Sequence, residues 1–189
     1  MERSIELRDP GAFRALAHPR RLALLGLLRI EGPLTATQAA ALLPGESSGS
    51  CSYHLRQLAR YGLVEEAPGG KGRQRPWRAT SLFTSWPDVA PTPELAAATA
   101  EFELLIAEQQ FARLARWIVS RSTEPAEWQE AASFGDALLY LTPTELAELR
   151  GDLEKLAERY LKRVTDPALR PEGARPVAFL QIAVPAVSE

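Results

Sequence analysis

The sequence predicts a mainly α (α+β) fold in two parts. The N-terminal part has short helices closed by a β-hairpin, and the C-terminal part is built on one long helix. Three observations lead to this prediction. Prolines and glycines divide the first 62 residues into short segments with helical apolar spacing. After Gly62 the pattern changes to short extended runs separated by glycines. From Glu94 onward, helical spacing continues for 28 residues.

Length and composition fit one large or two small globular domains. The chain has 189 residues, of which 46% are hydrophobic and 24% are charged. No apolar run reaches the ~20 residues that a membrane span requires, and the N-terminus carries acids instead of an apolar signal segment. The single cysteine, Cys51, cannot form an internal disulfide. We therefore expect a cytoplasmic protein with no membrane partner.

The charges are divided unevenly between the two parts. Residues 1–80 hold 12 Lys+Arg and 7 Asp+Glu, whereas residues 81–189 hold 10 and 17. A basic N-terminal part beside an acidic C-terminal part favours a polyanionic partner for the first part only.

Helix start and stop signals place four helices in the N-terminal part. Pro10 and Pro19 each suit the first turn of a helix, where the missing N–H costs nothing. Thr35 with Gln38 forms a capping box that predicts the start of a third helix. A fourth helix begins near Ser48 and ends before a glycine. The four expected ranges are 10–19, 19–32, 35–45 and 48–61.

Two short extended runs follow, LVEEA (63–67) and RPWRAT (75–80), and the PGGKGRQ between them has the glycines of a hairpin tip. Trp77 is expected to pack beneath this hairpin. The order of three helices, a turn, a fourth helix and a β-hairpin is that of a winged helix-turn-helix. In that fold the fourth helix enters the major groove of DNA, and the hairpin, or wing, contacts the adjoining backbone or minor groove.

The C-terminal part begins after residues 81–93, which contain three prolines and are expected to be a linker. A long helix over 94–121 follows, and then a buried strand at 136–141. The motif Thr142–Glu145 is a capping box with proline at the first helical position, and a second strand is expected at 175–185. The sequence therefore predicts a small strand–helix–strand, βαβ-like C-terminal region.

The middle helix of that region has an apolar seam with 3-4-3-4 spacing, which is typical of a helix that packs along another helix. The seam residues are Leu146, Leu149, Leu153, Leu156 and Tyr160. The predicted domains are 1–80, a DNA-binding domain, and 94–189, a dimerisation region for which effector binding stays open.

The fourth helix has the polar residues that reading DNA requires. Short side chains at its start let the backbone approach the bases, and longer ones behind them reach base edges and phosphates. The candidates for base edges are Ser48, Ser50, Ser52, Tyr53, His54 and Gln57. The candidates for phosphate and groove charge are Arg56, Arg60, Lys71, Arg73, Arg75 and Arg78. The alternatives are a solvated helix face with a serine cap, and a hairpin whose charges only keep its edge soluble.

Four segments, LAHPRRLALLGLL, TATQAAALL, SSGSCSYHLRQLARYGLVEE and GRQRPWRAT, together resemble the ArsR-type winged helix-turn-helix repressors of bacteria. The most diagnostic part is the run from Ser52 to Leu58 followed by GLV, and the resemblance covers residues 10–80. It implies a homodimer whose recognition helices read a palindromic operator in double-stranded DNA, as a repressor that an effector releases. It also implies that Cys51 is buried. Residues 94–189 resemble the C-terminal extensions of larger members.

The sequence departs from the metal-sensing members of that family. TATQAAALL has no metal ligand, and the chain has only two histidines, His18 and His54, so we expect no metal and no cofactor. His18, just before Pro19, is instead a candidate helix cap. The sequence contains no Ser/His/Asp set and no phosphate loop of the kind that would indicate an enzyme. A small-molecule effector stays open. The competing interpretation is a dimeric protein-interaction or small-molecule-binding protein that keeps the fold without specific DNA binding.

Overall fold

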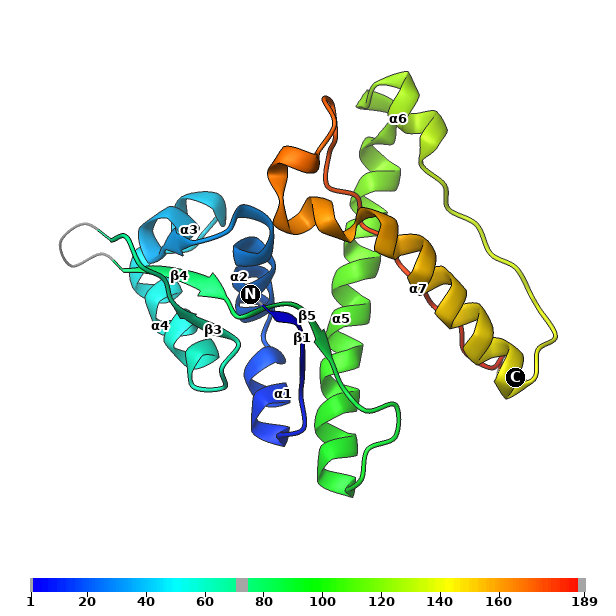
Figure 1. The fold of residues 1–189 in the computed structure, drawn as a ribbon, viewed down its shortest axis with the longest axis horizontal. Coiled ribbons are helices and arrows are strands. Elements are labelled where there is room, and N and C mark those ends of the chain that lie inside the picture. The colour runs from blue at the N-terminus through cyan, green and yellow to red at the C-terminus, as the bar shows by residue number, and fades with distance from the viewer. Residues whose placement is uncertain (1, 71–74, 187–189) are drawn as a thin grey trace. The chain divides into compact units, whose positions relative to one another are not determined.

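The computed structural model describes residues 2–70 and 75–186. Contacts divide the chain into two compact units, Met1–Leu114 and Ala115–Glu189, and each is considered by itself (Figure 1). This division falls later than the predicted boundary at residue 94, because α5 (Pro93–Ser120) begins in the first unit and ends in the second. The functional domains 1–80 and 94–189 stay a prediction.

The first unit contains the four short helices that the sequence predicts. Asp9, His18, Thr35 and Ser47 each accept a hydrogen bond from a backbone N–H of the helix that they precede, so each helix begins at a capped residue. Thr35 and Gln38 form the predicted capping box. The helices are α1 (Pro10–Leu16), α2 (Pro19–Glu31), α3 (Ala36–Leu42) and α4 (Ser48–Ala59).

The predicted hairpin is also present. Strands β3 (Val64–Glu66) and β4 (Pro76–Ala79) pair antiparallel, with Glu65 opposite Arg78. The other edge of β4 pairs with β2 (Leu34–Thr35), which gives the sheet order β2-β4-β3. A two-residue strand is too short to show any periodicity, so the sequence did not predict β2.

The expectation of a linker over 81–93 is wrong for its first five residues. Residues Ser81–Ser85 form β5, which pairs in parallel with β1 (Glu2–Glu6). The two strands lie side by side in Figure 1. Arg29 of α2 fastens β5, since its Nε donates to the Ser81 carbonyl at 3.1 Å and its Nη2 to Thr84 Oγ1 at 2.8 Å. Burial lowers the pKa of Arg29 to about 10.

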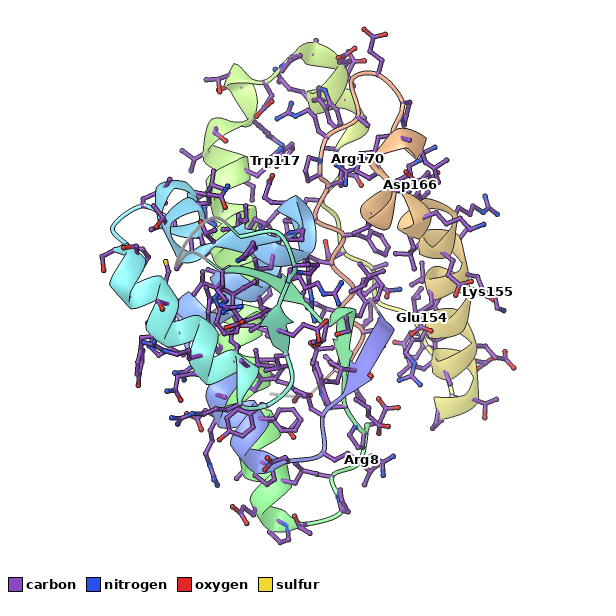
Figure 2. The ribbon with its side chains drawn as sticks, turned by 60° about the vertical axis from the view of Figure 1, so that its left-hand side comes forward. Arg8, Trp117, Glu154, Lys155, Asp166 and Arg170 are labelled. Atoms are coloured by element: carbon purple, nitrogen blue, oxygen red, sulfur yellow. The ribbon has the colours of Figure 1, made fainter. Side chains whose placement is uncertain are left out.

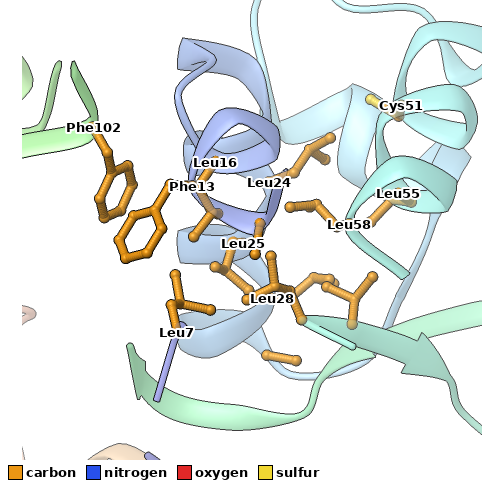
Figure 3. Close-up of a cluster of buried hydrophobic side chains, with 14 of the residues drawn as sticks. Leu7, Phe13, Leu16, Leu24, Leu25, Leu28, Cys51, Leu55, Leu58 and Phe102 are labelled. Carbon is orange, nitrogen blue, oxygen red and sulfur yellow. The ribbon is translucent and has the colours of Figure 1, made fainter. Parts of the chain in front are cut away.

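The core of the first unit lies between the helices and the sheets (Figure 3). Leu24, Leu25 and Leu28 of α2 meet Leu55 and Leu58 of α4 there, and all five are buried. A second group is aromatic and joins α1 to α5. Its members, each packed edge-on to the other two, are Phe13, Trp86 and Phe102.

The second unit contains α6 (Ala126–Ala131) and α7 (Pro143–Thr165), and α7 begins at the predicted Thr142–Glu145 capping box. The strands predicted at 136–141 and 175–185 are wrong, because both segments lie in no strand or helix. Both segments are runs of apolar residues, which predict a strand only where a partner strand completes the hydrogen bonds. The fold class itself is confirmed as mainly helical with small sheets.

No helix in the described ranges 2–70 and 75–186 is both long enough and apolar enough to cross a membrane.

Candidate nucleic-acid interface

Helix α4 has one buried side and one polar side. It begins after Ser47, whose Oγ accepts a hydrogen bond from the Ser50 N–H at 3.1 Å. Cys51, Leu55 and Leu58 point into the core, with no exposed surface. The burial predicted for Cys51 is therefore confirmed. With three apolar positions fixed in the core, the remaining side of the helix is held at the surface.

Three of the candidate residues form a row along that polar side. Ser48, Ser52 and Arg56 are spaced four residues apart and line one open groove with a volume of about 560 Å³. The other wall of the groove comes from the start of α3 and from the hairpin strands. Its remaining lining residues are Thr35, Ala36, Thr37, Gly49, Glu66, Arg75 and Trp77.

The groove matches the chemistry that DNA recognition needs. Small residues at the start of α4 leave room for a close approach, and the Arg56 guanidinium supplies positive charge, whereas Arg75 lies 3.6 Å from the Glu66 carboxylate in the same groove. Thr37 and Glu66 were not among the sequence candidates. Thr37 could have been found, because it lies two residues after the recognised Thr35 cap, but Glu66 enters the groove only through the pairing of β3 with β4.

Three further candidates lie on one flank of the row. Tyr53 is 52% exposed and stands edge-on to the His54 ring. Arg60 is exposed, and its Nη1 donates to Gln57 Oε1 at 3.4 Å. The structure thus leaves these six of the predicted α4 residues unburied, and three of them line the groove.

Ser50 is a correction to the predicted set. It is half-buried, and its Oγ donates to Glu46 Oε2 at 2.6 Å. Glu46 is itself ion-paired with Arg20 of α2. Ser50 therefore holds the start of α4 against α2 and does not offer a hydroxyl to the groove.

His54 is the second correction. It was predicted on the DNA-reading face, but it is only 8% exposed, and its ring lies 4.8 Å from the ring of His18. Among the described residues, its Nδ1 is a buried nitrogen without a hydrogen-bond partner. At about 100° per residue, position 54 lies about 200° from Ser52, so the helical period already places it on the buried side. Its role is in packing α4 against the start of α2.

The His54 environment makes the stability of the fold sensitive to acid. Burial, and then the nearby Arg21 and Arg20, lower the pKa of His54 below its ordinary 6.5, and burial likewise lowers the pKa of His18. The native state therefore binds fewer protons than the unfolded state as the pH falls through the unfolded value, so the stability decreases there.

We expect the urea midpoint to fall between about pH 7.5 and 5.5 in the wild type, and to fall less in His54→Gln, which cannot take up that proton. The measurement is urea unfolding at both pH values. An identical decrease in wild type and variant would contradict this assignment.

The hairpin carries fewer unbalanced cations than its sequence indicates. Arg78 is bound to Glu65, at 2.8 Å from Nε and 2.7 Å from Nη2, and Arg75 Nε lies 3.6 Å from a Glu66 carboxylate oxygen. Lys71 and Arg73, which were predicted to lie on the wing, fall outside the described residues. Trp77 is half-buried and packs against the core, as predicted. Of the described wing cations, Arg75 has the looser ion pair and faces the groove.

One comparison with known proteins bears on this segment. Residues 16–67 match the family model of a helix-turn-helix domain. These residues include α2, α3, α4 and β3, so the match and the fold identify this part of the chain as a helix-turn-helix domain. This domain match supports a DNA-binding transcriptional regulator. A search of curated proteins found no match.

Several solved structures are similar to the chain. One is a homodimeric winged helix-turn-helix DNA-binding domain from Mycobacterium bovis, described as a possible ArsR-family transcriptional regulator, with 23% identity over 53% of this chain and 76% of its own, and a TM-score of 0.34. An ArsR family transcriptional regulator has 28% identity over 54% of this chain and 86% of its own, with a TM-score of 0.32. A mutant of MarR from E. coli has 16% identity over 79% and 87%, with a TM-score of 0.33.

The first two descriptions name the ArsR family. Because their TM-scores are low, the assignment rests on the match over residues 16–67 and on the fold of that segment.

Proposed function

We propose that the chain is a transcriptional regulator that binds an operator in double-stranded DNA through α4 and the β3–β4 wing. The observation that supports this most is the row of Ser48, Ser52 and Arg56, which faces an open groove in a segment that matches a helix-turn-helix domain. In this proposal α4 enters the major groove, the two serines allow close approach, and Tyr53 and Gln57 reach base edges. Arg56, Arg60 and Arg75 meet phosphates.

The regulator acts as a homodimer on a palindromic site and represses transcription by occupying it. Two-fold symmetry of the protein requires half-sites whose centres are ~10 bp or a multiple of that apart. The test is a selection of genomic fragments by the purified chain, followed by sequencing of the bound pool. Recovery of one inverted repeat with this spacing supports the proposal, and a reporter that carries the repeat at its promoter shows whether bound protein lowers transcription. Enrichment of no sequence, with and without cell extract as a source of effector, would contradict it.

The wing gives a separate expectation. Replacing Arg75 with alanine removes one phosphate contact, so the affinity for every duplex falls and the slope of log K against log salt decreases by about 0.9. Fluorescence anisotropy at four salt concentrations measures this slope. Arg8→Ala is the matched control, because Arg8 is also an exposed arginine in an exposed ion pair but follows β1 outside the helix-turn-helix. An unchanged slope in Arg75→Ala would contradict the proposal that the wing contacts DNA.

That the chain is not an enzyme and that it is cytoplasmic are predictions that accompany this proposal, and whether a small-molecule effector exists stays open. The second candidate, a protein-interaction module with this fold, draws support from the ion pairs that neutralise Arg75 and Arg78. It predicts weak DNA binding without sequence preference, and the selection above separates the two.

A further inference from the structure

Helix α7 presents an apolar seam that the described chain covers only in part. Its residues Leu146, Leu149, Leu153, Leu156 and Tyr160 follow the 3-4-3-4 spacing of one helix face. Leu146, Leu149 and Leu153 are half-buried, and Leu156 and Tyr160 are 49% and 59% exposed. A seam of this length on a helix of 23 residues is far more regular than scattered surface leucines.

The described residues of the unit that contains α7 form no buried core. Between 115 and 186, none of the residues whose burial is described is buried. A helix in water gains most of its stability by packing its apolar face, so α7 requires a partner that covers this seam.

The charges of α7 indicate what that partner is. Its first half, 143–153, has three acids and one arginine. Its second half, 154–165, has two acids and four cations, so the halves carry net charges of −2 and +2. A second α7 in antiparallel orientation places the acidic half of each helix beside the basic half of the other, and a parallel one places like charges together. The same order of charges complements the dipole of each helix, and antiparallel packing also aligns the two dipoles favourably.

The seam also defines a register. Leu146 lies seven residues before Leu153, and Tyr160 lies seven residues after it. We propose that α7 packs antiparallel against α7 of a second copy of this chain, with Leu153 on the two-fold axis and Leu146 facing Tyr160 of the other copy. This inference rests on the homodimer of the proposed function and adds the surface that forms it.

A symmetric cysteine tests this register in the full-length chain. Leu153→Cys places two thiols at the axis, where their Cβ atoms approach the ~4 Å that a disulfide requires. Mild oxidation is therefore expected to convert most of the protein into a covalent dimer on a non-reducing gel. Lys155→Cys is the matched control, since Lys155 lies about 200° around the helix from Leu153 and projects away from the α7 axis (Figure 2). The wild-type chain, in which Cys51 is buried, measures the background level of crosslinking.

Equal crosslinking of Leu153→Cys and Lys155→Cys would overturn the inference, and so would a crosslink in neither. A second measurement introduces a charge into the apolar seam. Leu153→Glu brings two carboxylates together on the axis and is expected to raise the dimer dissociation constant about tenfold or more in sedimentation equilibrium. Lys155→Arg, which lies on the opposite side and keeps the charge of the basic half, is expected to leave it within about twofold of wild type. Dimers of equal strength in both variants would contradict the α7 interface.

These outcomes are separate from the fate of the proposed function. If the Leu153→Cys chain selects one DNA sequence but does not crosslink, the proposed regulator is supported and the α7 interface is contradicted. If the Leu153→Cys chain crosslinks but shows no DNA sequence preference, the α7 interface is supported and the proposed regulatory function is contradicted.

Discussion

Replacing Leu58 with alanine is expected to lower the free energy of unfolding by about 3 kcal/mol, within the range of ~2–5 kcal/mol for buried leucines. Leu58 has no exposed surface and packs in the core that α4 shares with α2 (Figure 3). Its removal deletes apolar contacts and leaves a cavity beneath the helix that carries the polar row. DNA affinity is expected to decline together with stability, because the position of α4 depends on this core.

Urea unfolding followed by circular dichroism measures the change. Leu42→Ala is the matched control: the same deletion at the last residue of α3, where the leucine is 51% exposed, is expected to cost less than ~1 kcal/mol. A similar loss for both variants would contradict the placement of Leu58 in the core.

Introducing a carboxylate in the middle of the polar row is expected to have the largest effect on binding. Ser52→Glu fills the space between α4 and the DNA and sets a negative charge against the phosphates. We expect the affinity for the selected operator to fall about 100-fold, or ~2.7 kcal/mol, with an unchanged urea midpoint.

Ser52→Ala is the control for the same position, because it keeps the small side chain that close approach requires. Its affinity is expected to fall less than about fivefold, the usual value of one hydrogen bond. Anisotropy titrations of both variants with the operator duplex provide the comparison. Equal affinities of the glutamate and alanine variants would show that this face of α4 does not meet DNA.

The elements that the sequence predicts correctly are those with local signals. The four short helices begin at caps that are visible in the chain, and Thr35 with Gln38 and Thr142 with Glu145 form the capping boxes that the spacing indicates. The β3–β4 hairpin follows from two extended runs around glycines. In each case the residues that decide the structure lie within a few positions of one another.

The elements that the sequence does not predict depend on distant partners. Strand β5 exists because it pairs with β1, 79 residues away in the chain, and no local pattern shows that pairing. The runs at 136–141 and 175–185 have strand-like composition but no strand partner in the described chain. Apolar composition thus indicates a need for burial without showing what supplies it.

The candidate site divides in the same way. Ser48, Ser52 and Arg56 were predictable from the helix and its polar face. Predicting the burial of His54 requires its angle on the helix to be weighed against its polar side chain. Predicting that Ser50 does not face the groove requires its tertiary contact with Glu46 to be known. The balance of charge on the wing required the β3–β4 register, which places Glu65 opposite Arg78.

The central claim is that the α4 face reads a particular DNA sequence. The most direct measurement is the dissociation constant of the purified chain for the selected inverted repeat and for a random duplex of equal length, by anisotropy at two salt concentrations. We predict that the protein binds the repeat at least ~10³-fold more tightly than the random duplex at the higher salt concentration. Equal dissociation constants for the two duplexes, both weakening in parallel as salt rises, would contradict the account and leave only non-specific attraction to phosphate.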